Sequence, residues 1–180
     1  MIEAARRPVD IRLDRIVVAV DPPAMGGVGN AACGIVAAGC GGEGFNRRAV
    51  VLADATVRGA QPHEWAAKAI ALAESLGANA IVAEANNGGE MVRAVLQTAA
   101  PHCAVKLVHA SVGKSARAEP IAAFYAQGKV THAAAFPELE DEMCAFGAGE
   151  CRTSPDRVDA LVWALTDLLL GREGPRIRAL

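Results

Sequence analysis

Two carboxylates stand where apolar runs of the sequence end. Asp21 ends residues 15–21, a run rich in β-branched residues that is typical of a buried strand, and the two prolines after it cannot continue a strand ladder. Glu84 ends a second apolar run, residues 80–84. If the two runs are neighbouring parallel strands, both acids lie at the same edge of a sheet. Open α/β sheets bind their ligands at such an edge.

Two further acids open the last helical pattern of the chain. Asp156 and Asp159 are three positions apart, so they share a face of the first helical turn. Apolar residues follow them, which indicates that the helix packs and that its start can be fixed against the sheet. A helix N-terminus also accommodates negative charge. Either acid could therefore join the two at the strand ends.

Carboxylates brought this close repel each other unless a cation lies between them. A hard divalent ion, Mg²⁺ or Mn²⁺, is a natural partner for oxygen ligands. Three carboxylates on rigid elements suit phosphoryl transfer by two ions about 4 Å apart. A simpler interpretation stays open, because an acid at a strand end is often only solvated and an aspartate at a helix start often only caps it.

The pattern along the chain predicts the elements that position these acids. Three apolar runs joined by short glycine-rich segments indicate an antiparallel meander, and later strands alternate with helices. This order predicts an α/β fold with a mixed five-stranded sheet, three antiparallel strands followed by parallel ones, and helices on both faces. Right-handed crossovers make the first strand central. The strands are expected at 15–21, 33–40, 48–54, 80–84 and 104–109.

Helical spacing of apolar residues predicts the covering helices. They are expected at 62–76, around 91–96, at 115–127, 136–146 and 155–170, and residues 129–132 are a candidate for a short edge strand. The 180 residues suit one domain, and a net charge of −2 neither indicates nor excludes nucleic acid. Five scattered cysteines without a CxxC pair indicate reduced thiols in a cytoplasmic protein.

Five segments, in this order, together resemble the C-terminal nuclease domain of the large terminase subunit, the DNA-packaging motor of tailed phages and gene transfer agents. They are VAVDPP (18–23), VAEANNGG (82–89), GKSARAEP (113–120), FPELE (136–140) and SPDRVDALVW (154–163). The resemblance implies an RNase H-like fold and an endonuclease that cuts double-stranded DNA during genome packaging with Mg²⁺ or Mn²⁺, two ions being expected.

The resemblance also assigns roles to the acids. Asp21, Glu84 and Asp159 match the acidic triad of the family, which is both catalytic and metal-binding. Asp156 is an auxiliary ligand, or it replaces Asp159 as the third one.

Three further residues are candidate DNA contacts. Lys114 and Arg117 follow the fifth predicted strand and start a helix, where basic groups are unfavourable for the helix dipole. A role in binding phosphates explains their placement, although a solvated helix start is the alternative. Asn87, in the turn after Glu84, is the third candidate.

The resemblance further implies partners. Large terminases carry an N-terminal ATPase domain, and residues 112–115 only imitate the end of a P-loop, because position 108, where the motif requires its first glycine, is valine. We therefore expect an ATPase domain and the portal protein as partners in the intact motor, no membrane, and a monomeric isolated domain in the cytoplasm of the host or producing cell. The expected divisions are 1–14 as tail or linker, 15–171 as the nuclease domain and 172–180 as a C-terminal tail.

Two other functions stay open from the sequence. One is another RNase H-like nuclease of the junction resolvase type. The other is a non-catalytic DNA-binding or docking module whose acids are vestigial.

Overall fold

A computed structural model describes residues 2–23, 31–86, 89–99, 103–151 and 154–171. Its strands are β1 (Arg15–Asp21), β2 (Ala32–Gly41), β3 (Arg48–Asp54), β4 (Val57–Arg58), β5 (Ala80–Glu84), β6 (Val105–Val108) and β7 (Val130–His132). Its helices are α1 (Ile2–Ala5), α2 (Pro62–Leu76), α3 (Gly89–Ala99), α4 (Lys114–Ala126), α5 (Pro137–Gly147) and α6 (Asp156–Leu165), with a 3₁₀ turn η1 (Gly44–Asn46) and a π-helical extension of α6, η2 (Thr166–Leu170).

The strands form one mixed sheet in the order β6-β5-β1-β2-β3-β7. β1, β2 and β3 are antiparallel neighbours, whereas β5 and β6 run parallel to β1 on its other side. The predicted mixed sheet and the central place of the first strand are thereby confirmed. Two short strands extend the five expected ones. β7 pairs with β3 at the opposite edge, where the sequence offers a candidate edge strand, and β4 pairs with the start of β2.

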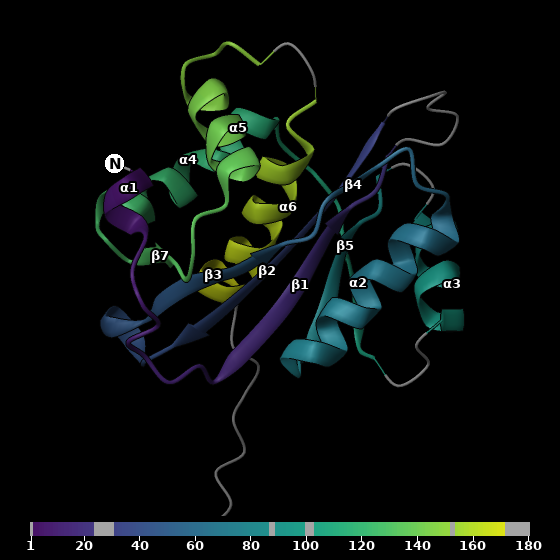
Figure 1. Cartoon of the computed structure of the whole chain (residues 1–180), viewed down its shortest axis with the longest axis horizontal. Coiled ribbons are helices and arrows are strands. Elements are labelled where there is room, and N and C mark those ends of the chain that lie inside the picture. The colour runs from purple at the N-terminus through teal and green to yellow at the C-terminus, as the bar shows by residue number, and fades with distance from the viewer. Residues whose placement is uncertain (1, 24–30, 87–88, 100–102, 152–153, 172–180) are drawn as a thin grey trace, which may run out of the picture.

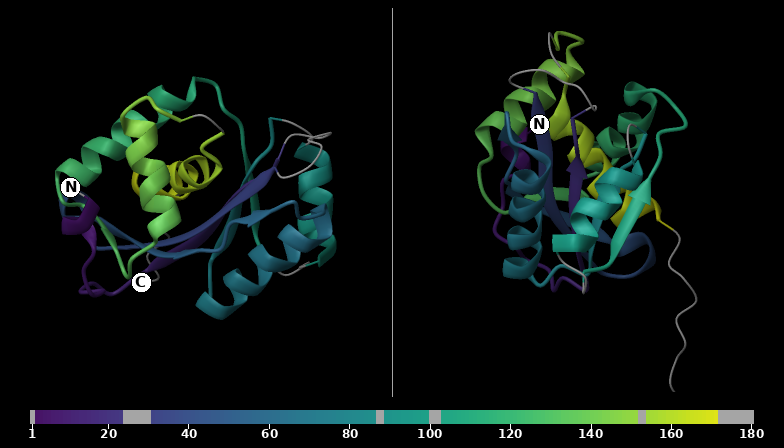
Figure 2. Two further views of the ribbon diagram at one scale, coloured as in Figure 1. Left: turned by 45° about the horizontal axis from the view of Figure 1, so that its top comes forward. Right: turned by 90° about the vertical axis from the view of Figure 1, so that its right-hand side faces the viewer.

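Helices cover both faces of the sheet, as expected (Figures 1 and 2). The alternation of side chains along β1 separates two apolar clusters. Val17 and Ala19 pack on the side of α4, α5 and α6, while Val18 and Val20 pack on the side of α2 and α3. Because β1 and β2 are buried on both faces, their sequences read as continuous apolar runs.

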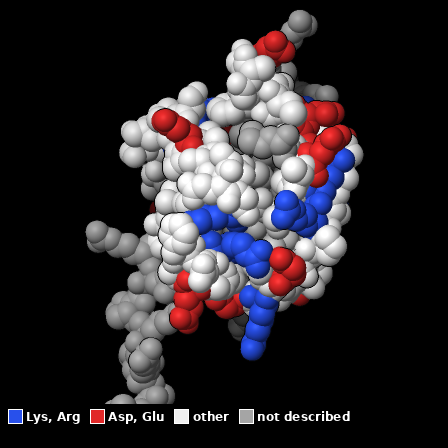
Figure 3. Space-filling view, turned by 90° about the vertical axis from the view of Figure 1, so that its left-hand side faces the viewer, with Lys and Arg blue, Asp and Glu red and all other residues white. Residues whose placement is uncertain are grey.

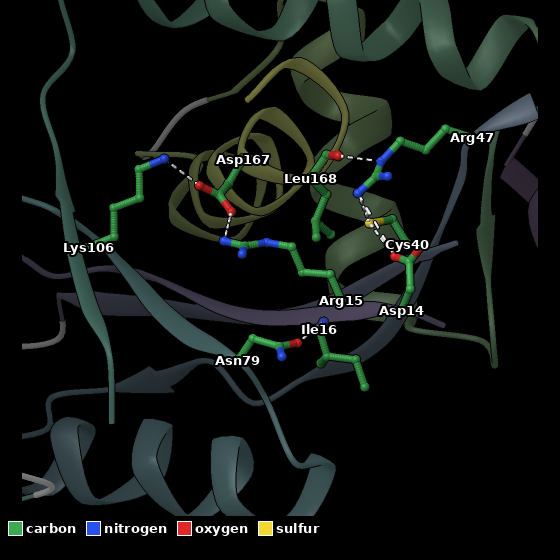
Figure 4. Close-up of polar contacts among 9 residues, drawn as sticks. All are labelled: Asp14, Arg15, Ile16, Cys40, Arg47, Asn79, Lys106, Asp167 and Leu168. Atoms are coloured by element: carbon green, nitrogen blue, oxygen red, sulfur yellow. Dashed lines mark hydrogen bonds and ion pairs between the residues drawn. The ribbon is translucent and has the colours of Figure 1, made fainter. Parts of the chain in front are cut away.

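The C-terminal end of α6 is tied to the sheet by polar contacts (Figure 4). Asp167, whose side chain is almost fully buried, accepts hydrogen bonds from Arg15 Nη2 at 2.8 Å and from Lys106 Nζ at 2.6 Å. Burial opposes ionisation of this carboxyl, but the two cations outweigh it and hold the pKa of Asp167 below its ordinary value. Arg47 Nε also donates to the Leu168 carbonyl at 3.0 Å. α6 is therefore anchored at the end that lies away from its two acids.

The N-terminal segment attaches to the β7 edge through a partly buried network. Arg6 forms an isolated bridge with His132, and its Nη2 lies 2.5 Å from Glu140 Oε2. The hydrogen bond from Arg6 is the main reason why the pKa of Glu140 falls to about 2. His132 is fully buried and contacts both Glu140, at 3.0 Å, and the Tyr125 hydroxyl, at 2.8 Å.

The expected division at residue 14 stays a prediction, and residues 172–180 lie outside the described part.

Charged side chains of both signs gather on the face that carries α1 and β7 (Figure 3). Near this edge Arg48 pairs with Asp10 at 3.0 Å. Arg6 forms its ion pair with Glu140 on the same face. Arg6 and Arg48 therefore have structural partners on this face. Among the described helices, we find none with the length and apolar character that a membrane span requires.

Candidate active site

Asp21 and Glu84 end neighbouring parallel strands at the same edge of the sheet. The register of β1 and β5 pairs Val20 with Ala83, so the two acids are the next residues along their strands. On the other side of β1, Asp21 lies opposite Gly34 of β2. The parallel arrangement that the sequence analysis required is thus present, and the sheet itself fixes the spacing of these two carboxylates.

The first turn of α6 lies directly against this edge. Gly34 permits the approach, because a Cβ atom on it would overlap the carbonyl oxygen of Asp156 and would lie 3.1 Å from the Ala160 Cβ. α6 begins at Asp156, one residue later than expected, and Pro155 occupies the cap position. Asp159 is buried at 4% exposure. The glycine in β2 therefore brings the helix acids toward Asp21.

Contacts that the sequence did not reveal hold this first turn. Glu142 of α5 accepts a hydrogen bond from the Val158 backbone N–H at 2.9 Å, which caps the helix. Arg157 is also buried, and it pairs with Asp54 of β3 at 2.9 Å and with Glu138 of α5. Arg157 thus joins α6 to both the sheet and α5, whereas Asp156 and Asp159 remain on the side of Asp21.

Two cations from the start of α4 enter the acid cluster, which we define as Asp21, Glu84, Asp156 and Asp159. Lys114 Nζ contacts the Asp159 carboxylate and lies 3.0 Å from Ser154 Oγ. Arg117 Nη2 donates to Asp159 Oδ1 at 2.9 Å and lies 4.0 Å from Glu84 Oε2. The Arg117 side chain is only 10% exposed, and its Nε is a buried donor without a partner among the described residues.

Burial and neighbouring negative charges both oppose ionisation in the acid cluster. Burial, together with the charges of Asp159, Glu84 and Asp156, raises the pKa of Asp21 to about 9, although Lys114 acts in the opposite sense. Burial is also the main reason why the pKa of Asp156 is raised. Asp21 therefore retains its proton at neutral pH unless a further cation enters the cluster.

This donor set fits hard divalent cations. Four carboxylates on rigid elements supply the oxygen ligands that Mg²⁺ and Mn²⁺ prefer, and their mutual repulsion favours a cation between them. In the described part of the chain, no three acidic, histidine or cysteine side chains are yet arranged closely enough to hold an ion. Lys114 and Arg117 supply the positive charge instead, so ion binding requires that at least Asp159 exchange partners.

The turn after β5 and one tryptophan of α6 adjoin the acid cluster. Asn87 lies outside the described residues, so its role stays a prediction. Its neighbour Asn86 accepts a hydrogen bond from the Ala110 backbone N–H at 2.9 Å, which ties the turn after β5 to the segment after β6. Trp163 donates its indole Nε1–H to Glu84 Oε2 at 2.6 Å. The two partners of this hydrogen bond are far apart in the chain, so the local sequence pattern could not predict it.

Arg58 is a basic residue near the acid cluster that the sequence analysis did not consider. It lies in β4 opposite Ala32, two positions along β2 from the glycine that faces Asp21. Its side chain is exposed and has no carboxylate partner among the described residues. Its positive charge acts on Asp156, where it lowers the pKa against the effect of burial.

Comparison with known proteins adds a family match. The model of the family described as Terminase RNaseH-like domain matches residues 18–168, which include all four acids of the cluster. Comparison with curated proteins gave no match.

Several solved structures share the fold. The human cytomegalovirus terminase nuclease domain is 12% identical, with a TM-score of 0.60, and the alignment covers 92% of this chain and 91% of that chain. The nuclease domain of the large terminase subunit of bacterial virus Sf6, solved with manganese and beta-thujaplicinol, is 15% identical, with a TM-score of 0.59 and coverage of 85% and 88%. The large terminase nuclease of thermophilic phage G20c is 18% identical, with a TM-score of 0.58 and coverage of 87% and 84%.

Proposed function

The chain belongs to the family of terminase RNaseH-like domains, and from this premise we propose that it is a metal-dependent endonuclease that cuts double-stranded DNA during viral or gene-transfer-agent genome packaging. One observation carries the proposal. The ends of β1 and β5 and the first turn of α6 bring four carboxylates to one edge of the sheet, where burial and mutual repulsion raise the pKa of Asp21.

Asp21, Glu84 and Asp159 are the proposed ligands of two ions, with Asp156 as an auxiliary ligand. Bound Mg²⁺ or Mn²⁺ would supply an activated water and would stabilise the leaving oxygen of the phosphodiester. Asp21, between the strand acid and the helix acids, is the ligand that we expect to matter most for holding the ions. The backbone positions of the ligands are fixed by packed elements, and their side chains are proposed to converge when the ions bind.

Lys114 and Arg117 are proposed to exchange partners during this reaction. In the structure both contact Asp159. When ions neutralise the acids, the two cations are available for DNA phosphates, which they would position over the cluster. The same role is proposed for Asn87.

In the intact motor we propose that this domain works beside an ATPase domain and the portal protein, which would supply translocation and part of the DNA affinity. The isolated domain is proposed to be monomeric, to act in the cytoplasm of the host or producing cell and to have no membrane partner.

Arg58 is expected to bind the DNA backbone beside the cleavage site. Arg58→Ala should weaken binding of a labelled duplex and reduce the slope of log affinity against log salt by about 1, because one phosphate contact is lost. Fluorescence anisotropy in EDTA measures this without cutting. Lys68→Ala is the matched control, since Lys68 is an exposed cation on α2, on the other face of the sheet. Equal effects of the two substitutions would argue against a specific role for Arg58.

Cleavage of supercoiled plasmid tests the proposed function. We expect nicked and linear products with Mn²⁺ or Mg²⁺ and none with EDTA, because the acids need divalent ions to act on a phosphodiester. A panel of duplex, four-way junction and RNA–DNA hybrid identifies the substrate class. Preference for the junction would instead support a resolvase. Absence of cutting at every protein concentration, together with metal-independent duplex binding, would support a non-catalytic module.

A further inference from the structure

Trp163 touches two members of the site at once. Its indole Nε1–H donates to Glu84 Oε2 at 2.6 Å, and the guanidinium carbon of Arg117 lies 4.8 Å from the centre of its ring. The residue is 7% exposed, so the indole is enclosed by these neighbours and by the core under α6. Of the two tryptophans in the chain, Trp65 lies on the other face of the sheet, in the cluster under α2.

The position of Trp163 on α6 couples two proposed ligands. Trp163 and Asp159 are four residues apart, so they share one face of the helix. Asp159 enters the acid cluster directly, while Trp163 reaches the end of β5 through its hydrogen bond to Glu84. A single turn of α6 therefore sets both the place of one carboxylate and the orientation of another.

We propose that Trp163 is a positioning residue that holds the Glu84 carboxylate in the orientation needed to bind a divalent cation. This inference rests on the proposed function. A carboxylate has two oxygens, and the indole bonds to Oε2, so Oε1 is left to bind an ion. Arg117, packed over the ring, limits rotation of the indole from its other side.

The hydrogen bond, rather than the bulk of the ring, makes this role specific. Phenylalanine at position 163 would retain an aromatic ring in the same place but would have no N–H to donate. Glu84 would then lose its fixed partner and rotate toward Arg117, whose Nη2 is already 4.0 Å away. Loss of a group that orients a metal ligand typically costs 10–100-fold in metal affinity. We therefore expect Trp163→Phe to weaken Mg²⁺ and Mn²⁺ binding by about tenfold or more.

Calorimetric titration of Mg²⁺ and Mn²⁺ into wild type, Trp163→Phe and Trp65→Phe tests the proposal. Trp65 is 1% exposed and makes no polar contact with the acid cluster, so its replacement controls for the loss of a buried indole. Affinity should fall only in Trp163→Phe. Equal affinities in all three proteins would overturn the role of Trp163 and leave the proposed function intact. If the wild type binds neither ion, the proposed function fails and the inference fails with it.

Tryptophan fluorescence provides a second measurement that does not depend on the folding of Trp163→Phe. In Trp65→Phe the remaining indole is the one bound to Glu84, so Mg²⁺, which is not paramagnetic, should shift its emission with the same midpoint as the calorimetric titration. In Trp163→Phe the remaining Trp65 should not respond. An unchanged Trp163 emission at saturating Mg²⁺ would show that the indole does not sense the Glu84 carboxylate, which contradicts the proposal.

Discussion

Asp21→Asn is expected to remove DNA cutting while it raises the melting temperature of the metal-free protein. Loss of this metal ligand should lower the cleavage rate by about a thousandfold or more, because metal ions supply several kcal/mol of transition-state stabilisation. The amide keeps the shape of the carboxyl group but needs no proton, whereas burial and the charges of Asp159 and Glu84 keep Asp21 protonated in the folded protein. Removal of about 1 kcal/mol of this protonation cost raises the melting temperature of a domain this size by about 2–4 °C.

The dependence on pH separates this explanation from a general stabilisation. The pKa of Asp21 is about 9 in the folded protein against an ordinary 3.8. Between these values the folded state retains a proton that the unfolded state has released, so the contribution of Asp21 to stability falls as the pH rises. Thermal melts in EDTA at both ends of this pH range measure the effect. The melting temperature of the wild type should fall as the pH rises, and that of Asp21→Asn should not show this fall. The assignment of Asp21 as a metal ligand would be contradicted if Asp21→Asn lowered the melting temperature at every pH. It would also be contradicted if the variant still cut DNA.

Gly34→Ala is expected to damage both the fold and the site. The added Cβ would overlap the backbone of Asp156, which cannot move without displacing the first turn of α6. Overpacking of this kind typically costs about 1–3 kcal/mol, and the shift should carry Asp159 away from Asp21. We therefore expect a lower free energy of unfolding in urea, weaker Mn²⁺ binding and slower cutting.

Gly147→Ala is the matched control for this substitution. Gly147 ends α5, and a Cβ on it would meet no heavy atom within 4 Å. Alanine also favours a helix over glycine, so this variant should show no loss of stability or activity. If Gly34→Ala behaves like Gly147→Ala, the close approach of α6 to β2 does not set the geometry of the site.

The sequence could predict the sheet acids because their placement follows from local patterns and one chirality rule. An apolar run ending in Asp21 and another ending in Glu84 identify two buried strands, and right-handed crossovers make them neighbours. The same patterns predict the covering helices, since Pro62 and Gly77 bound α2 where expected. These features depend on residues close together in the chain.

The remainder of the site depends on contacts between distant segments, which periodicity does not encode. Lys114 and Arg117 could be placed at a helix start, but not against Asp159, which is more than forty residues away. The hydrogen bond from Trp163 spans 79 residues. An apolar helical position predicts burial of the ring correctly, but it says nothing about where the indole N–H points.

Diffraction from crystals soaked in Mn²⁺, recorded for anomalous scattering, tests the central claim most directly. We expect anomalous peaks between Asp21, Glu84 and Asp159, with the Lys114 ammonium withdrawn from Asp159 and the indole of Trp163 still bonded to Glu84. Crystals of Asp21→Asn should lack these peaks. The result that would contradict the account is a fully occupied Mn²⁺ site elsewhere, or none at saturating Mn²⁺, with Lys114 and Arg117 still bound to Asp159.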